Sequence, residues 1–308
     1  MSSNTNKQTK ICHFSDLHLP LARPVPPWRL LGKRVLGWAN LRFNRGKTFH
    51  LAAFESLVGR LVEEDADLSV MTGDLTSLAF EFEFEEVDRI LRKVGLDSQK
   101  TVVVPGNHDR YAISADFRCA FERGMSDWLP EGFSRERGYP FVRIVGSVAL
   151  VGLDTAVWRN PARAAGYIGR DQVDRLVALL DSEEFLGKWP VIAMHHPPFH
   201  LRTAHLRDYR SGLDGVDYLV RALGDRAATI VHGHLHVTAR RRIGNLDVIG
   251  VASGSNDAGS PARQLAYHIY TFDSSGLKKA EGMRHWPGRQ HEDENFERFE
   301  LPTEAPAD

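Results

Sequence analysis

The sequence predicts an α/β protein in which short apolar strands alternate with amphipathic helices. Two observations support this class. Five apolar segments of strand length are each followed by a polar residue of a metal-binding type, and helical periodicity fills several of the intervals between them. Additional strand-like segments near the end of the chain are consistent with a second sheet. The composition, with 42% hydrophobic and 26% charged residues, is typical of a globular protein.

The strands that define this pattern are short and rich in Val, Ile and Leu. We expect them at residues 11–14, 68–71, 101–104, 191–194 and 228–231. Apolar residues recur at helical spacing between them. This spacing predicts helices near residues 50–64, 81–94, 171–180 and 213–223.

Antiparallel strands are expected in two further places. Residues 141–145 and 148–153 flank a Gly146-Ser147 turn, which predicts a hairpin. After the last metal-ligand-type residue, three more strands are predicted. They cover residues 240–243, 246–251 and 265–272.

Seven residues of metal-binding types follow the five strands. They are Asp16, His18, Asp74, Asn107, His195, His234 and His236. Two pairs among them have even spacing, which places both side chains of a pair on one face of an extended segment. Sites in α/β folds gather at the carboxyl ends of strands, so we expect these side chains to converge. Nitrogen and oxygen ligands in this number indicate a site for two divalent metals, which suits phosphoester hydrolysis.

The order of these residues resembles the calcineurin-like metallophosphoesterase superfamily, whose pattern is D-x-H, GD, GNH[D/E], H and GHxH. All five blocks are present without substitution, from Ile11 to about His236, which is roughly three quarters of the chain. The resemblance implies a four-layer α/β/β/α sandwich with two mixed β-sheets. It also implies a dimetal site at the carboxyl ends of the strands.

The resemblance also implies how the ligands divide between two metals. The first metal would take Asp16, His18, Asp74 and His236. The second metal would take Asp74, Asn107, His195 and His234, so that Asp74 bridges the two ions. The isolated histidine of the family precedes a proline by two positions, which selects His195 and leaves His196 beside the site.

Other residues of the motifs have expected roles near the metals. The family assigns the histidine of GNH, here His108, to the leaving group as general acid or hydrogen-bond donor. Asp109 would either orient His108 or cap a turn. Arg110 and Tyr111 are candidates for substrate contact. Asp154 is a candidate for contact with the metal ligands, without binding a metal itself. With no thiolate ligand, we expect manganese, or iron with manganese, ahead of zinc.

The resemblance favours a phosphodiesterase of the bacterial cyclic-nucleotide and glycerophosphodiesterase branch, acting through a hydroxide shared by two metals. The alternative is a pyrophosphatase for a nucleotide-linked lipid, such as a lipid A precursor. Its best-known representatives carry arginine where this chain has His108, which counts against it. A metal-free scaffold is the third hypothesis, although such relatives have lost ligands and this chain retains all of them.

Composition limits the partners. The net charge of −1 gives no general attraction to nucleic acid, so we expect a small phosphorylated substrate. The polar first residues lack a secretory signal and no apolar run is long enough to span a membrane. Cys12 and Cys119 give no disulfide framework, so a reducing cytoplasm is expected. The sequence leaves the oligomeric state open.

We expect one metallophosphoesterase domain over residues 1–289, with an insertion at 20–47, and a flexible acidic tail at 290–308. The insertion contains seven Lys and Arg, no acidic residue, and both Trp28 and Trp38. One hypothesis is a solvated insertion that packs its aromatic residues on the body. The other is a cationic lid over an anionic substrate, or a peripheral contact with membrane lipid.

Overall fold

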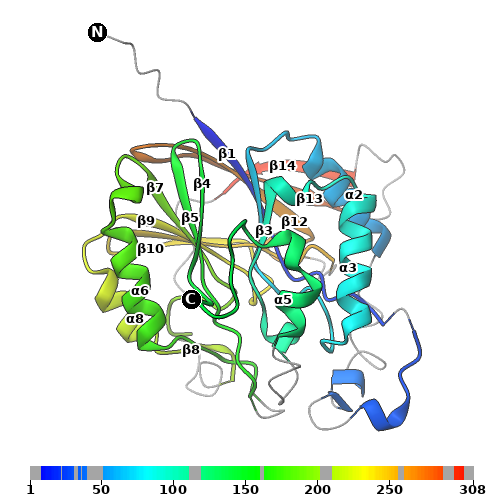
Figure 1. Ribbon diagram of the computed structural model, residues 1–308. Coiled ribbons are helices and arrows are strands. Elements are labelled where there is room, and N and C mark those ends of the chain that lie inside the picture. Colours follow the sequence, from blue (N-terminus) through cyan, green and yellow to red (C-terminus); the bar gives the residue numbers. More distant parts are fainter. Residues whose placement is uncertain are drawn as a thin grey trace.

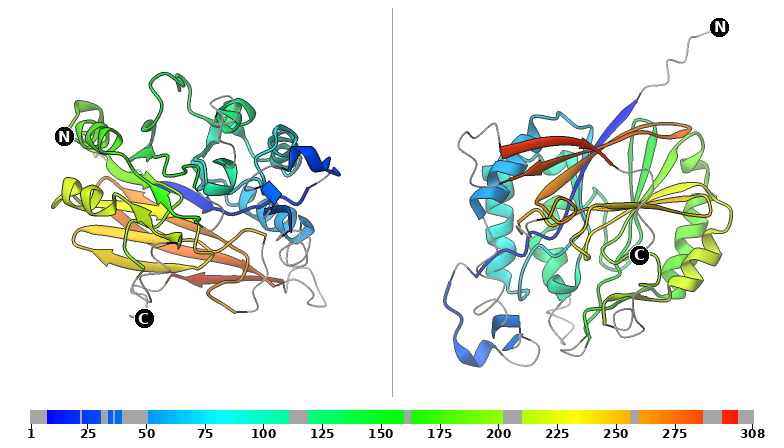
Figure 2. Two further views of the ribbon diagram at one scale, coloured as in Figure 1. Left: turned by 90° about the horizontal axis from the view of Figure 1, so that it is seen from below. Right: turned by 180° about the vertical axis from the view of Figure 1, so that it is seen from behind.

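The protein is a sandwich of two six-stranded mixed sheets with helices outside each sheet, as Figures 1 and 2 show. This computed structural model confirms the four-layer α/β/β/α class that the sequence motifs imply. It describes residues 8–21, 23–30, 34–35, 37–39, 51–110, 119–159, 163–201, 210–255, 260–286 and 295–301.

The first sheet has the strand order β14-β13-β12-β1-β2-β3. Its members are β1 (Thr9–Phe14), β2 (Leu68–Met71), β3 (Thr101–Val103), β12 (Ala266–Asp273), β13 (Gly276–His285) and β14 (Phe296–Glu300). Strands β1, β2 and β3 are parallel, whereas β12 pairs antiparallel with β1. The parallel half therefore sends three carboxyl ends to one edge of the sheet.

The second sheet has the order β10-β11-β9-β7-β5-β4. It consists of β4 (Phe141–Val145), β5 (Val148–Gly152), β7 (Trp189–Ala193), β9 (Ala228–His232), β10 (Ala239–Ile243) and β11 (Leu246–Gly250). Strands β5, β7, β9 and β11 are parallel, with antiparallel neighbours at both edges. A separate two-stranded ribbon pairs β6 (Gly166–Tyr167) with β8 (Leu213–Asp214).

Helices cover the outer faces of both sheets. Figure 1 shows α2 (Leu51–Val62) and α3 (Glu81–Lys93) on one side, and α6 (Arg170–Leu180) and α8 (Val216–Leu223) on the other. The short α5 (Ala120–Gly124) follows the third strand. The 3₁₀ turns are η1 (Pro27–Arg29), η3 (Ser98–Lys100), η4 (Asn107–Arg110), η5 (Ser126–Trp128) and η6 (Glu183–Phe185).

The apolar runs of the second sheet supply two separate cores. In β5, Leu150 belongs to the cluster between the sheets, whereas its neighbour Val151 belongs to the cluster under α6 and α8. The same alternation places Val191 inside and Ile192 outside. Because both faces are buried, such strands appear as continuous apolar runs in the sequence.

Three segments differ from the sequence prediction. The helix expected over 213–223 begins only at Val216, because Gly215 adopts a left-handed φ of 90° between β8 and α8. Strands β13 and β14 were not predicted. Part of the tail expected to be flexible, Phe296–Glu300, is an edge strand paired with β13, while residues 302–308 lie outside the described part.

In the described ranges, no helix is long and apolar enough to cross a membrane. Of the insertion at 20–47, the structure describes residues 20–21, 23–30, 34–35 and 37–39. This described portion lies beyond the body near the start of α3, at the lower right of Figure 1.

Candidate metal centre

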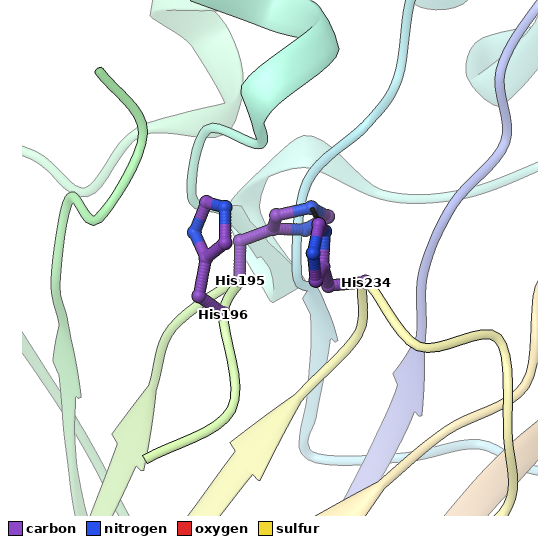
Figure 3. Close-up of side chains that lie close together, drawn as sticks. All are labelled: His195, His196 and His234. Carbon is purple, nitrogen blue, oxygen red and sulfur yellow. Dashed lines mark hydrogen bonds between the residues drawn. The ribbon is translucent and has the colours of Figure 1, made fainter. Parts of the chain in front are cut away.

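The ligand-type residues follow the ends of five strands that belong to two different sheets. Three of these strands are β1, β2 and β3 of the first sheet, and the other two are β7 and β9 of the second. Packing of the two sheets brings the five ends together. Figure 3 shows the rings of His195, from the end of β7, and His234, from the end of β9, pointing toward one another.

One group of donor atoms forms around His18. Its Nε2 lies 3.0 Å from Nε2 of His236, 3.7 Å from Oδ1 of Asp16 and 3.6 Å from Oδ2 of Asp74. Nε2 of His236 also lies 3.0 Å from Oδ1 of Asp16. These four residues are the set expected for the first metal.

A second group forms around His195. Its Nε2 lies 3.2 Å from Oδ1 of Asn107, 3.2 Å from Nδ1 of His234 and 3.4 Å from Oδ2 of Asp74. These four residues are the set expected for the second metal. The same oxygen of Asp74, Oδ2, therefore belongs to both groups, so this carboxylate would be able to hold both ions.

The backbone reaches this arrangement through left-handed turns rather than through extended strands. Positive φ values occur at Asp16, His18, Asp74, His234 and His236, between 45° and 67°. The argument from alternation along an extended segment was therefore wrong, because β1 and β9 end before these residues. Such φ values are uncommon outside glycine and typical of functional sites.

Two motif glycines allow the loops to approach the ligands closely. A Cβ at position 106 would lie 2.2 Å from the Asp74 nitrogen, and one at 233 would lie 2.4 Å from Oδ2 of Asp16. These separations are too short for any side chain. Gly106 and Gly233 are thus required by the approach of neighbouring backbone to the site.

Backbone carbonyls hold the far side of two ligand rings. Nδ1 of His195 lies 2.6 Å from the Thr72 oxygen, and Nε2 of His234 lies 3.1 Å from the Ser211 oxygen. A ring nitrogen facing a carbonyl must carry the proton, which leaves the other nitrogen of each ring with a lone pair. That nitrogen is the one within the donor group, as is usual for histidine ligands.

The charge balance of the cluster favours bound cations. Burial acts to raise the pKa of Asp74, but His195, His108 and His18 outweigh it and hold the pKa well below its usual value. Burial also acts to lower the pKa of His195, yet Asp74 and Asp16 raise it to about 9. The buried carboxylates are therefore stabilised by positive charge nearby. Divalent cations would provide that charge while the imidazoles stay neutral.

His108 lies beside the first donor group. Its ring contacts that of His18 edge to face, with centroids 4.7 Å apart. Its backbone N–H donates to Oδ1 of Asp74 at 2.7 Å, and its Nδ1 donates to the Ser77 oxygen at 2.9 Å. The Ser77 carbonyl thus fixes the orientation of the ring.

His196 is packed against the ligands, but both of its ring nitrogens have other partners. Nδ1 lies 2.9 Å from Oγ1 of Thr155, and Nε2 lies 3.0 Å from the Ala164 oxygen. Burial, with His234 and His195 nearby, holds its pKa well below the usual value. His196 therefore supports the rings of His195 and His234 (Figure 3) as a neutral side chain.

Of the two roles considered for Asp109, the structure gives it the turn-capping one. Its carboxylate accepts the backbone N–H of Gly106 at 2.9 Å, of Thr76 at 2.9 Å and of Leu75 at 3.3 Å, and also the Thr76 hydroxyl. Asp109 therefore joins the loops that carry Asp74 and Asn107. Burial and Asp74 raise its pKa to about 6.

Arg110 and Asp154 lie in an ion-pair network at the margin of the site. Arg110 binds Glu122 through two nitrogens and Asp154 at 2.8 Å, and its side chain is buried. The network joins η4 to α5 and to the residues after β5. Tyr111, the other residue considered for substrate contact, lies outside the described ranges.

A family model described as calcineurin-like phosphoesterase matches residues 9–238 of the sequence. The chain belongs to this family. No curated protein matched the sequence in a separate comparison. The family uses a dinuclear divalent metal centre, and the two donor groups with their shared Asp74 oxygen fit such a centre.

Solved structures share the fold at low sequence identity. A dimetal phosphatase from Danio rerio is 13% identical, with a TM-score of 0.59 over 96% of this chain and 99% of that one. A purple acid phosphatase from yellow lupin seeds is 12% identical, with a TM-score of 0.58 over 95% of this chain and 53% of that one. At these identities the comparison establishes the fold alone.

As a calcineurin-like phosphoesterase, the chain is a metal-dependent phosphoester hydrolase. Two divalent ions at such a site polarise phosphoryl oxygens and lower the pKa of a bound water. The protein contributes the donor atoms, the shared carboxylate and the adjacent His108.

Sequence reasoning missed the residues that hold this machinery in place. Thr72, Ser77 and Ser211 act through backbone carbonyls, for which no side-chain pattern exists. Glu83, whose carboxylate accepts the backbone N–H groups of Ser77 and Phe80, could have been found in part from the sequence. An acidic residue in the first turn of a predicted helix is a frequent cap.

Proposed function

We propose that this protein hydrolyses phosphodiesters at a site containing manganese, or iron with manganese, and that zinc can replace them. The observation that carries the proposal is the pair of donor groups that share Oδ2 of Asp74, with His108 alongside. Imidazole nitrogens together with carboxylate and amide oxygens suit these metals. A non-catalytic scaffold would have no need of a complete donor set.

The surroundings of the site favour a diester over a monoester. A monoester dianion carries one more negative charge than a diester and gains more from a nearby arginine. Arg110, the arginine that follows the site motif, is neutralised by Glu122 and Asp154. A diester, with a single charge, depends less on binding by an arginine. His108 lies beside the donor groups, where it can donate a proton to the leaving oxygen.

The test compares bis(p-nitrophenyl) phosphate with p-nitrophenyl phosphate, using manganese-loaded protein and Asp74→Ala as the blank. We expect a higher kcat/KM for the diester. A clear preference for the monoester would overturn the diester assignment and leave the metal-dependent hydrolase in place.

A nucleotide-linked lipid pyrophosphate is a second candidate substrate. It is favoured by Trp28 in the insertion, whose side chain is 74% exposed next to the exposed Arg29. An exposed tryptophan beside an arginine is suited to a lipid interface. Hydrolysis of such a lipid by the parent protein, reduced in Trp28→Ala while the chromogenic diester is cleaved as before, would favour this candidate.

A further inference from the structure

The loop between Asp74 and α3 holds a carbonyl that orients His108. Nδ1 of His108 donates to the Ser77 oxygen at 2.9 Å, and the Ser77 hydroxyl donates to the Leu19 oxygen at 2.8 Å. The direction of the Ser77 carbonyl is fixed by the plane of the peptide unit that joins Ser77 to Leu78, because a peptide unit is rigid. A residue that fixes the orientation of this peptide plane therefore also fixes the orientation of the His108 ring.

Glu83 holds that peptide plane from inside the protein. Its side chain is 1% exposed, and its carboxylate accepts the Leu78 N–H at 3.2 Å. This N–H belongs to the same peptide unit as the Ser77 carbonyl. The carboxylate also accepts the N–H of Ser77 at 2.9 Å and of Phe80 at 2.8 Å, so one buried group binds three donors of a single loop.

Arg34, from the insertion at 20–47, holds the next peptide units from the other side. Its Nε donates to the Leu78 oxygen at 2.9 Å and its Nη2 to the Ala79 oxygen at 2.8 Å. The guanidinium also lies 4.1 Å from the centroid of the Phe80 ring. Although it belongs to a cationic segment, Arg34 is a buried side chain.

Arg34 and Glu83 together bind four successive peptide units, from the one that joins Thr76 to Ser77 to the one that joins Ala79 to Phe80. The middle of this stretch includes Ala79, whose φ of 56° is uncommon for alanine and needs such support. Two opposite charges from outside the loop, Arg34 and Glu83, therefore help to hold its shape.

We infer that Arg34 and Glu83 are positioning residues for His108, and that the insertion at 20–47 thereby supports departure of the leaving group. The inference rests on the proposed role of His108. The charged side chains do not touch the reacting atoms. They act through the Ser77 carbonyl, whose displacement would let the imidazole turn away from the leaving oxygen.

The test uses Arg34→Met, which removes both hydrogen bonds and keeps an apolar stem, with Arg60→Met as the matched control. Arg60 is exposed on α2 and likewise lies over a phenylalanine ring, that of Phe296, at 5.8 Å. The measurement is kcat for aryl phosphodiesters of increasing leaving-group pKa. We expect Arg34→Met to lose about 10- to 100-fold with the poorest leaving group and little with the best. Arg60→Met should match the parent throughout.

Three further measurements separate positioning from a general loss of structure. Metal content and thermal midpoint of Arg34→Met should stay close to those of the parent. Arg34→Lys, which keeps the charge and one donor, should recover part of the lost rate. Guanidinium ion at millimolar concentration should partly restore Arg34→Ala with poor leaving groups.

His108→Ala provides the reference for interpretation. If His108→Ala depends on the leaving group and Arg34→Met loses the same factor on every substrate, or loses metal, the positioning role is wrong and the proposed function stands. If His108→Ala itself shows no such dependence, the acid role fails instead. Should Arg34→Met not fold, Arg34→Lys and Glu83→Gln decide the question by the same comparison, and parent-like slopes in both would overturn the inference.

Discussion

Asp74 is the residue on which the whole centre depends. Its Oδ2 joins both donor groups, its Oδ1 accepts the backbone N–H of His108, and its backbone is left-handed. Oδ2 of Asp74 lies 3.6 Å from Nε2 of His18 and 3.4 Å from Nε2 of His195. Removing it should therefore affect both metals together.

Asp74→Ala is expected to lower metal content and reduce turnover by at least about 100-fold. Asp65→Ala is the matched control, because Asp65 also has a positive φ, 45°, but its side chain is 92% exposed and pairs with Lys100 instead of a ligand. Elemental analysis gives the metal content of each variant. Two metals retained at full occupancy in Asp74→Ala would refute the bridging assignment.

His108 should matter for rate and not for metal binding. His108→Ala is expected to retain both metals and lose roughly 100-fold in kcat, with smaller losses for good leaving groups that need less protonation. His200→Ala, at an exposed histidine paired with Asp217, serves as the control. Equal losses across leaving groups would argue against a proton-donating role.

At the scale of elements, the insertion at 20–47 contains arginines with different surroundings. Arg34 is buried against the loop before α3, whereas Arg23 and Arg29 are exposed and lie near the rings of Phe82 and Phe80. The packing hypothesis concerned the aromatic residues of the insertion, and it describes Trp38, which packs against the core, but not Trp28, which is exposed. The hypothesis of a cationic contact surface concerns Arg23 and Arg29.

If the exposed arginines meet anionic lipid, Arg23→Gln combined with Arg29→Gln should weaken binding to phosphatidylglycerol vesicles. Each cation near such a surface contributes about 1 kcal/mol, so the loss should be roughly tenfold or more and should shrink as salt is added. The comparison protein carries Arg170→Gln and Arg221→Gln, two exposed positions at α6 and α8. Equal vesicle binding by both double variants would exclude this surface.

At the scale of the molecule, the centre joins the two sheets. Strands β1, β2 and β3 provide part of each donor group and β7 and β9 provide the rest, so bound metals connect the halves of the sandwich. Removing the ions leaves Asp16, Asp74 and four histidines close together between the sheets.

Chelation should therefore lower the thermal midpoint, and added Mn²⁺ should restore it. Binding at 100 times the dissociation constant stabilises the folded state by about 2.7 kcal/mol per site, which corresponds to a rise of about 5 °C or more. Differential scanning fluorimetry of parent and Asp74→Ala checks this. A rise of the same size in Asp74→Ala would place the stabilising metal elsewhere.

The α/β class, the order of the five ligand-bearing strands and the seven converging residues could all be predicted from local patterns in the sequence. These were predictable because the apolar runs are local and because each ligand follows its strand directly. Strands β13 and β14 escaped prediction because they are polar strands toward the edge of a sheet, and their pairing supplies what their own residues do not indicate.

The roles of individual residues around the site became clear only from their contacts in the folded protein. His195 and His196 are adjacent in sequence, and their roles differ because Thr155 and Ala164 take both nitrogens of His196. Asp109 caps two loops, and Arg34 is a buried loop-binding residue within a segment that looks like solvated surface. The hydrogen bonds of His196 to Thr155, of Thr76 to Asp109 and of Arg34 to Leu78 each join residues more than thirty positions apart. Such partners are chosen by packing of the sheets and loops, which local sequence does not encode.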